Sequence, residues 1–194
     1  MKYLAVLLIC CAALSSAREL PTLKIGDKAP EFALKNYDGK EYSLPALMKE
    51  HAINVVMFIA TQCPVSNAYN ERMEQIFETY SAKGIGVVAI NANKEEDVAA
   101  ITAHAKEHGF RFPVLKDLKN VIADRYGAQV TPEIFVIVKD GTVAYHGRID
   151  DSRKADGVQS RDLALALDAL LAGKQPPKTE TKAIGCTIKR IASN

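Results

Sequence analysis

The stretch INVVMFIATQCP, residues 53–64, contains the transition that decides the fold. Its first part, Ile53–Ala60, is rich in Ile and Val and has the almost unbroken apolar pattern of a strand buried on both faces. Its last residue, Pro64, is typical of the first turn of a helix. Cys63 therefore lies where a buried strand ends and a helix begins.

Outward from this point the sequence alternates between strand and helix patterns. The apolar spacing predicts helices, each closed by a nearby Gly, over Pro64–Lys83, Glu95–His108, Lys119–Tyr126 and Arg161–Leu171. It predicts further strands over Ile85–Ile90, Glu133–Val138 and Thr142–His146. Since strand–helix–strand units pair in parallel and hairpins add antiparallel strands, we expect one mixed sheet with helices on both faces.

Two Asp-Gly pairs predict tight turns. Asp140-Gly141 separates the last two predicted strands, and Asp38-Gly39 lies within Phe32–Leu44. Asp-Gly is favoured in two-residue hairpin loops because both positions there need a positive φ. We therefore expect a hairpin at each place, the earlier one forming an N-terminal preamble. The predicted fold class is α/β.

The N-terminus has the pattern of a secretory signal peptide. Lys2 precedes the apolar run Tyr3–Leu14, and small residues end at Ala17, so we expect cleavage between Ala17 and Arg18. The run is shorter than the roughly 20 residues that a membrane-spanning helix needs. We expect an exported protein, periplasmic or secreted, with no membrane segment after cleavage; an uncleaved anchor is the alternative.

The remaining chain divides into two parts. Residues 18–173 are the expected length of one domain, and residues 174–194 form a tail that Pro176-Pro177 should keep extended. The formal net charge of the whole chain is +2. This near-neutral balance gives no reason to expect nucleic acid or an anionic membrane as a partner.

The cysteines point to redox chemistry. Signal cleavage would remove Cys10 and Cys11 and leave Cys63 and Cys186. Two cysteines in an exported protein suggest a disulfide or a redox pair, and a purely structural disulfide stays possible. Backbone N–H groups at a helix N-terminus stabilise thiolate, so we expect Cys63 to be the reactive thiol. The tail can span roughly 40 Å and bring Cys186 to Cys63.

Four motifs, in order, resemble those of thioredoxin-fold redoxins of the AhpC/TSA type. They are LKIGDKAPEF (23–32), FIATQC (58–63), FPVLKD (112–117) and YGAQVTPEIF (126–135). A peroxiredoxin-like subgroup is the most similar, because it shares Cys63-Pro64, residues 131–135 and the late sequence GCTIK (185–189). The resemblance implies a thioredoxin-like three-layer α/β/α fold with a mixed central sheet.

The resemblance also implies roles for site residues. A cis peptide at Thr131-Pro132 would press the Thr131 backbone against Cys63 and offer an edge to an extended substrate chain. Glu133, beside that loop, is a candidate proton carrier; alternatively it is solvated or paired with Arg148. In typical peroxiredoxins a Thr three residues before the reactive Cys orients the peroxide. Here that position is Ala60, and Thr61 is the nearby hydroxyl.

Three functions follow as alternatives. The first is extracytoplasmic thiol–disulfide exchange, in which Cys63 attacks and Cys186 resolves; the second is a peroxiredoxin-like thiol peroxidase. The third is a non-catalytic binding or metal-carrier module with a structural Cys63–Cys186 disulfide. The expected partners are protein thiols and disulfides or a peroxide, together with an external thiol reductant. We expect no cofactor and no metal, since the four histidines lack a ligand-like spacing, and the oligomeric state stays open.

Overall fold

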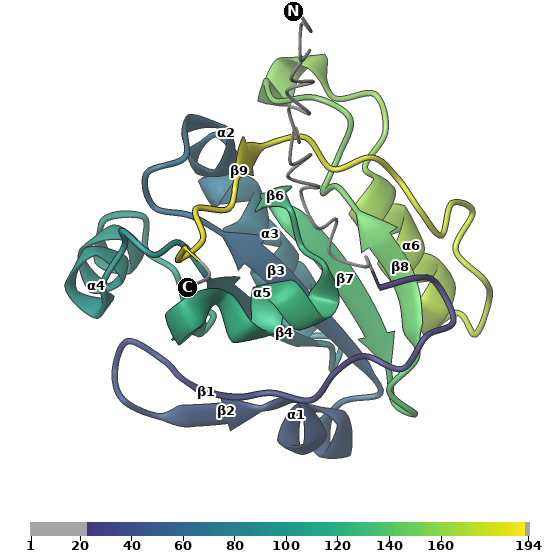
Figure 1. Cartoon of the computed structure of the whole chain (residues 1–194). Coiled ribbons are helices and arrows are strands. Elements are labelled where there is room, and N and C mark those ends of the chain that lie inside the picture. Colours follow the sequence, from purple (N-terminus) through teal and green to yellow (C-terminus); the bar gives the residue numbers. More distant parts are fainter. Residues whose placement is uncertain (1–22, 193–194) are drawn as a thin grey trace, which may run out of the picture.

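A five-stranded mixed sheet lies at the centre of the computed structural model, which describes residues 23–192 (Figure 1). The predicted signal peptide lies outside the described residues. The strand order is β5-β4-β3-β7-β8, with bounds β3 Ile53–Ile59, β4 Gly86–Asn91, β5 Val114–Lys116, β7 Glu133–Val138 and β8 Val143–Gly147. β3, β4 and β5 pair in parallel, and β7 is antiparallel to both β3 and β8. The mixed sheet is therefore confirmed.

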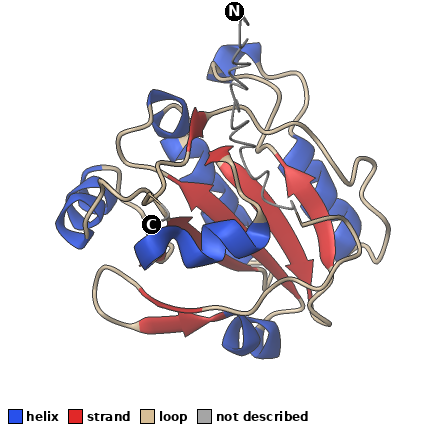
Figure 2. Ribbon diagram, in the orientation of Figure 1, coloured by secondary structure: helices blue, strands red, loops and turns tan. Residues whose placement is uncertain are grey.

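Helices cover both faces of this sheet (Figure 2). Their bounds are α1 Leu44–Glu50, α2 Pro64–Asn67, α3 Asn70–Ser81, α4 Val98–Glu107, α5 Val121–Tyr126 and α6 Asp162–Leu171. Alternate residues of β3 enter different core clusters: Met57 packs with residues of α3, α4 and α6, whereas Phe58 packs with residues of α1 and α5. Since β3 is buried on both faces, the predicted three-layer α/β/α fold is confirmed.

Three predicted helices differ from the structure, and the one expected from Lys119 begins at Val121 because Lys119 and Asn120 have positive φ. The helix expected over Pro64–Lys83 is divided into α2 and α3 at Tyr69, whose N–H donates to Ser66 O (2.9 Å) and whose ring lies 3.8 Å from the Arg72 guanidinium. The helix expected from Glu95 begins only at Val98. There the Asp97 side chain accepts the Ala100 N–H (2.8 Å), and this N-cap sets the first turn.

The N-terminal hairpin is formed by β1 Ala33–Lys35 and β2 Glu41–Ser43, as expected from Asp38-Gly39. Besides the two-residue strands described below and two short 3₁₀ turns, two elements were not predicted, α1 and β5. In α1, Ser43 caps the helix by accepting the Ala46 N–H (3.3 Å). β5 is a strand of only three residues. Within residues 23–192, no helix has both the length and the apolar character needed to cross a bilayer.

The tail is extended, but it is bound to the domain along its length. Lys178 Nζ lies 3.3 Å from the Asp162 carboxylate. A backbone bridge to β8 follows, where His146 N–H donates to Thr179 O and Thr181 N–H donates to His146 O, both at 2.9 Å. Further on, β9 (Cys186–Thr187) pairs antiparallel with β6 (Val130–Thr131). Figure 1 shows this yellow strand beside β6 and α2, at one end of the central sheet.

Candidate active site

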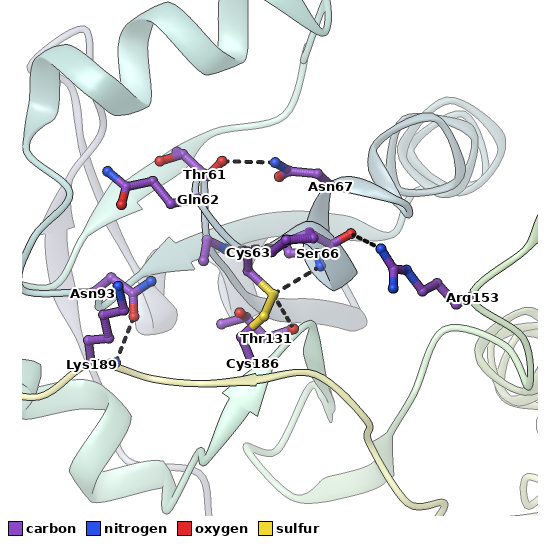
Figure 3. The surroundings of a disulfide bond; sticks show 12 residues. Thr61, Gln62, Cys63, Ser66, Asn67, Asn93, Thr131, Arg153, Cys186 and Lys189 are labelled. Carbon is purple, nitrogen blue, oxygen red and sulfur yellow. Dashed lines mark hydrogen bonds between the residues drawn. A yellow bond between two sulfur atoms is a disulfide. The ribbon is translucent and has the colours of Figure 1, made fainter.

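Cys63 is the N-cap residue of α2 and is 3% exposed. Its Sγ accepts the N–H of Ser66 (3.2 Å), as Figure 3 shows. The same sulfur lies 3.3 Å from the carbonyl oxygen of Thr131. Pro64 directly after Cys63 begins the helix without needing a backbone partner. The strand-to-helix position therefore gives Cys63 an amide donor on one side and the backbone of β6 on the other.

A disulfide joins Cys63 to Cys186, with the two Cα atoms 5.9 Å apart. The predicted approach of the two cysteines is thereby confirmed. Cys186 is held opposite Thr131 by the β6–β9 pairing, so the tail brings its cysteine in as part of a strand. The Ile188 N–H extends this contact by donating to Gln129 O (2.9 Å).

The Thr131-Pro132 peptide bond is cis, as expected. Thr131 is 2% exposed, and its backbone lies against both cysteines. Gly185 passes so close to this backbone that any Cβ would collide with the Thr131 carbonyl. A Gly immediately before Cys186 is therefore a requirement of the close approach between tail and β6.

Glu96 holds the loop that leads to Cys63, a role the sequence did not reveal. This carboxylate is 1% exposed and accepts the backbone N–H groups of Thr61 (2.6 Å) and Gln62 (3.2 Å). Asn91 Nδ2 (2.5 Å) and Asn93 Nδ2 (2.8 Å) complete its shell. Burial raises the pKa of Glu96, but these hydrogen bonds outweigh burial and hold the pKa below its ordinary value.

Ser66 is a second positioning residue that the sequence did not single out. Its backbone N–H reaches the Cys63 sulfur, while its hydroxyl accepts the N–H of Ala60 (3.2 Å) at the end of β3. Ser66 is fully buried and so closes the turn between β3 and α2. Asn67 closes it from the other side by donating from Nδ2 to Thr61 O (2.9 Å).

Thr61, the hydroxyl residue next to the position at which typical peroxiredoxins have a Thr, contacts the site loop through its backbone. Its backbone N–H and carbonyl bind Glu96 and Asn67. Figure 3 places the Thr61 side chain on the far side of the loop from the two sulfurs. Among the described residues, its hydroxyl makes no hydrogen bond to Cys63, so Thr61 contributes to the site through its backbone.

Glu133 is neither solvated nor paired with Arg148, and that alternative is wrong. The side chain is 4% exposed, and its Oε2 accepts the N–H groups of Gln129 (2.7 Å) and Val130 (3.0 Å). Its Oε1 lies 2.7 Å from His146 Nε2. Since Gln129 and Val130 directly precede the cis-proline loop, Glu133 fixes the edge that the tail pairs with.

His146, the partner of Glu133, is buried as well. Its ring stacks on Phe135, with centroids 4.4 Å apart, and its Nδ1 lies 3.9 Å from the Glu180 carboxylate of the tail. Arg148 binds Asp162 through Nε at 2.7 Å, so its charge is already matched. Residues 23–192 contain no cluster of three or more His, Cys, Asp or Glu side chains arranged to hold a metal ion.

Comparisons with known proteins agree with this geometry. The family model described as "AhpC/TSA family" matches residues 25–146. Thiol-disulfide oxidoreductase ResA from Bacillus thuringiensis (strain Al Hakam) is 30% identical over 121 residues, which are 62% of this chain and 68% of the relative. A ResA from Bacillus cereus is 27% identical over 144 residues, which are 71% and 81% of the two chains.

Two solved structures show how far the similarity extends. A hypothetical protein from Sinorhizobium meliloti 1021 is 34% identical, with a TM-score of 0.82 over 89% of this chain and 98% of that one. A thioredoxin-family thiol:disulfide interchange protein from Chlorobium tepidum TLS is 25% identical, with a TM-score of 0.57 over 68% and 92%. The similarity to the first structure covers nearly all of both chains.

Proposed function

Because this chain belongs to the AhpC/TSA family, we propose that it is a thiol–disulfide oxidoreductase that acts outside the cytoplasm, with Cys63 as nucleophile and Cys186 as resolving thiol. One observation carries the proposal. The Cys63 sulfur lies beside the Ser66 N–H and the Thr131 carbonyl while it is bonded to a cysteine on a two-residue strand of the tail. The proposed export rests on the signal-peptide pattern of residues 1–17.

In the proposed reaction the reduced protein donates two electrons. The Cys63 thiolate attacks one sulfur of a client disulfide, that S–S bond breaks, and the other client sulfur leaves as a thiolate. The Cys186 thiolate then attacks the Cys63 sulfur, and the client's remaining sulfur leaves with its electron pair and takes up a proton. The products are a client dithiol and the Cys63–Cys186 disulfide, which an external thiol reductant reopens.

The surrounding residues take positioning roles in this proposal. The Ser66 N–H stabilises the sulfur in its anionic form, and Glu96 keeps the loop before Cys63 in place through the Thr61 and Gln62 amides. Thr131 and cis-Pro132 present the backbone that an extended client follows. Glu133 fixes that backbone by accepting the two amides that precede it.

Peroxide reduction is the second candidate, because it would end in the same Cys63–Cys186 bond that the structure contains. Cys63 thiolate would attack a peroxide, release an alcohol or water, and become a sulfenic acid; Cys186 would condense with it and release a second water. The Thr61 hydroxyl, however, makes no hydrogen bond to Cys63 among the described residues. Disulfide exchange is therefore the function we propose.

The test is a direct competition between oxidants. Reduced protein is mixed anaerobically with equal concentrations of insulin or of hydrogen peroxide, and the Cys63–Cys186 bond is followed by quenched mass spectrometry. We expect faster bond formation with insulin, no exchange in Cys63→Ser, and a mixed disulfide that accumulates on Cys63 in Cys186→Ser. Faster oxidation by peroxide would assign the peroxidase function. If neither oxidant reacts and reduction unfolds the protein, the disulfide is structural.

A further inference from the structure

The tail occupies the edge on which the proposed function seats a client. β9 pairs with β6 over two residues, Val130 with Thr187 and Thr131 with Cys186. The tail's backbone contacts continue beyond this strand, because Lys94 N–H donates to Lys189 O (2.9 Å). Backbone contacts of this kind do not depend on sequence, so another extended polypeptide can make them. The tail and such a polypeptide cannot occupy the edge together.

Three side-chain positions of the tail do depend on sequence, and each has a fixed spacing from Cys186. Gly185, one residue before it, passes the Thr131 carbonyl where no Cβ fits. Ile188, two residues after it, is 3% exposed and belongs to the core cluster that contains Phe58 and Tyr126. Burial of such an aliphatic side chain is the main apolar anchor at this end of the tail.

Ile184, two residues before Cys186, is in a different situation. This residue is 66% exposed and borders a cavity of about 290 Å³. The cavity is lined by the apolar side chains of Val65, Tyr69, Pro132 and Ile149 and by four charged residues, Arg148, Asp150, Asp151 and Arg153. Pro132 is the cis-proline and Val65 follows Pro64, so two of the lining residues are close in sequence to Thr131 and Cys63. The tail therefore leaves unfilled a space that a larger apolar side chain at this position would occupy.

We propose that the tail occupies the client-binding edge of β6 and that a client must displace it. The tail's own sequence then indicates which residues this edge accepts in a client. On the basis of the proposed function, the site fits an extended polypeptide whose cysteine follows Gly, with an aliphatic residue two positions after the cysteine. A large apolar residue two positions before the cysteine binds better than Ile184 does, because it fills the cavity. When the tail returns to β6, Cys186 reaches Cys63 and the client leaves the same edge, so resolution and client release are one event.

The first test uses peptides. Full chain with Cys186→Ser, so that Cys63 is free, is mixed with peptides of the sequence Lys182–Arg190 whose cysteine carries thionitrobenzoate through a disulfide. Cys63 thiolate attacks the peptide sulfur and releases coloured thionitrobenzoate. Burial of one apolar side chain changes the affinity of a peptide, and with it the rate of its reaction, by up to about tenfold. We therefore expect a peptide with Ile184→Phe to react several-fold faster than the parent. We expect a peptide with Gly185→Val to react about tenfold slower, at the rate of a scrambled peptide.

The second test removes the occupant from the protein itself. Adding Gly185→Val to the Cys186→Ser chain places a side chain where the Thr131 carbonyl lies and prevents the tail from docking, so the parent peptide should react about tenfold faster. Ile188→Ala should act in the same direction through a different contact. The matched control is Ile191→Ala, an aliphatic residue of the same tail that is 49% exposed, and it should leave the rate unchanged.

The outcomes separate this inference from the proposed function. Equal rates for all peptides, or no acceleration when either variant frees the tail, would overturn the inference, provided that circular dichroism shows folded chains. In that case Cys63 would still react with dithiobis(nitrobenzoate), a small disulfide that needs no docking, and the proposed function would stand. If Cys63 fails to react with the small disulfide as well, the proposed function itself is wrong.

Discussion

Each of the two backbone segments that meet at the disulfide is held by a buried glutamate that accepts two consecutive backbone N–H groups. On the α2 side, Glu96 accepts the amides of Thr61 and Gln62. On the β6 side, Glu133 accepts the amides of Gln129 and Val130. Both carboxylates are buried, and each fixes two consecutive N–H groups close to a reactive group. A charged acceptor makes such bonds stronger than a neutral one would.

The two carboxylates differ in the side chains that form their other hydrogen bonds. The other donors to Glu96 are the side-chain amides of Asn91 and Asn93, which do not titrate. The other partner of Glu133 is His146, a titratable ring whose far nitrogen faces Glu180 of the tail. Both segments contact the tail: on the Glu96 side Asn93 Oδ1 accepts the Lys189 N–H (2.8 Å), and on the Glu133 side His146 faces Glu180. The contact on the Glu133 side passes through a titratable ring, whereas the one on the Glu96 side does not.

Glu96→Gln should have the largest effect on stability. Each carboxylate oxygen accepts one backbone N–H and one Asn side chain, so in either orientation the Gln NH₂ group would face two donors. We expect a loss of roughly 3 kcal/mol in the free energy of unfolding at neutral pH, measured by urea denaturation. A loss below about 1 kcal/mol would mean that the segment does not depend on this carboxylate.

The same variant has a defined pH dependence. Hydrogen bonds hold the pKa of Glu96 below its ordinary value of 4.5 in spite of burial. A lowered folded-state pKa contributes stability above the unfolded-state pKa, and the contribution disappears as the pH falls through the folded-state value. The stability difference between wild type and Glu96→Gln should therefore be constant above about pH 6 and shrink below the ordinary pKa. A difference that widens on acidification would contradict this account.

Glu133→Gln should cost less, and this contrast tests the comparison directly. One oxygen of Glu133 accepts both amides and the other faces His146 alone. A Gln can keep its oxygen toward the amides and turn its NH₂ group toward His146, whose neutral ring accepts a hydrogen bond at one nitrogen. We expect a loss of about 1 kcal/mol in the same urea experiment. An equal loss for the two Gln variants would show that the partners' chemistry is irrelevant.

Glu180→Gln should have the smallest effect. Its carboxylate lies 3.9 Å from His146 Nδ1, and its side chain is 70% exposed, so solvent screens the interaction. We expect the free energy of unfolding to change by less than about 0.5 kcal/mol. A much larger change, measured under the same conditions, would mean that the charge of the tail stabilises the β6 side through His146.

The sequence predicted most of the fold because its strongest patterns come from burial. β3 is apolar on both faces and supplies residues to both cores, so its run was recognisable without any partner. β6 and β9 escaped prediction because a two-residue strand has no periodicity of its own. The division between α2 and α3 escaped it because the apolar spacing continues across Tyr69, whereas the break follows from backbone contacts around Tyr69 and Arg72.

The sequence predicted the cysteines and the proline of the site, but it did not predict the contacts of the buried carboxylates that position them. Cys63-Pro64 after a buried strand and Thr131-Pro132 each carry a local pattern. Glu96 stands between Glu95 and Asp97, and nothing in the spacing of three acidic residues indicates that the middle one is buried. The pairing of Glu133 with His146 depends on the hairpin register of β7 and β8, which adjacent residue types do not reveal.

The Cys63–Cys186 bond also gives the molecule a mechanical property. It joins positions that are 123 residues apart, so residues 64–185 form a covalent loop that a force applied at the two ends of the chain cannot extend. Opening the bond would release roughly 400 Å of contour length. Reduction of this one bond thus allows a pulling force to unfold and extend residues 64–185, which the oxidised protein keeps in a closed loop.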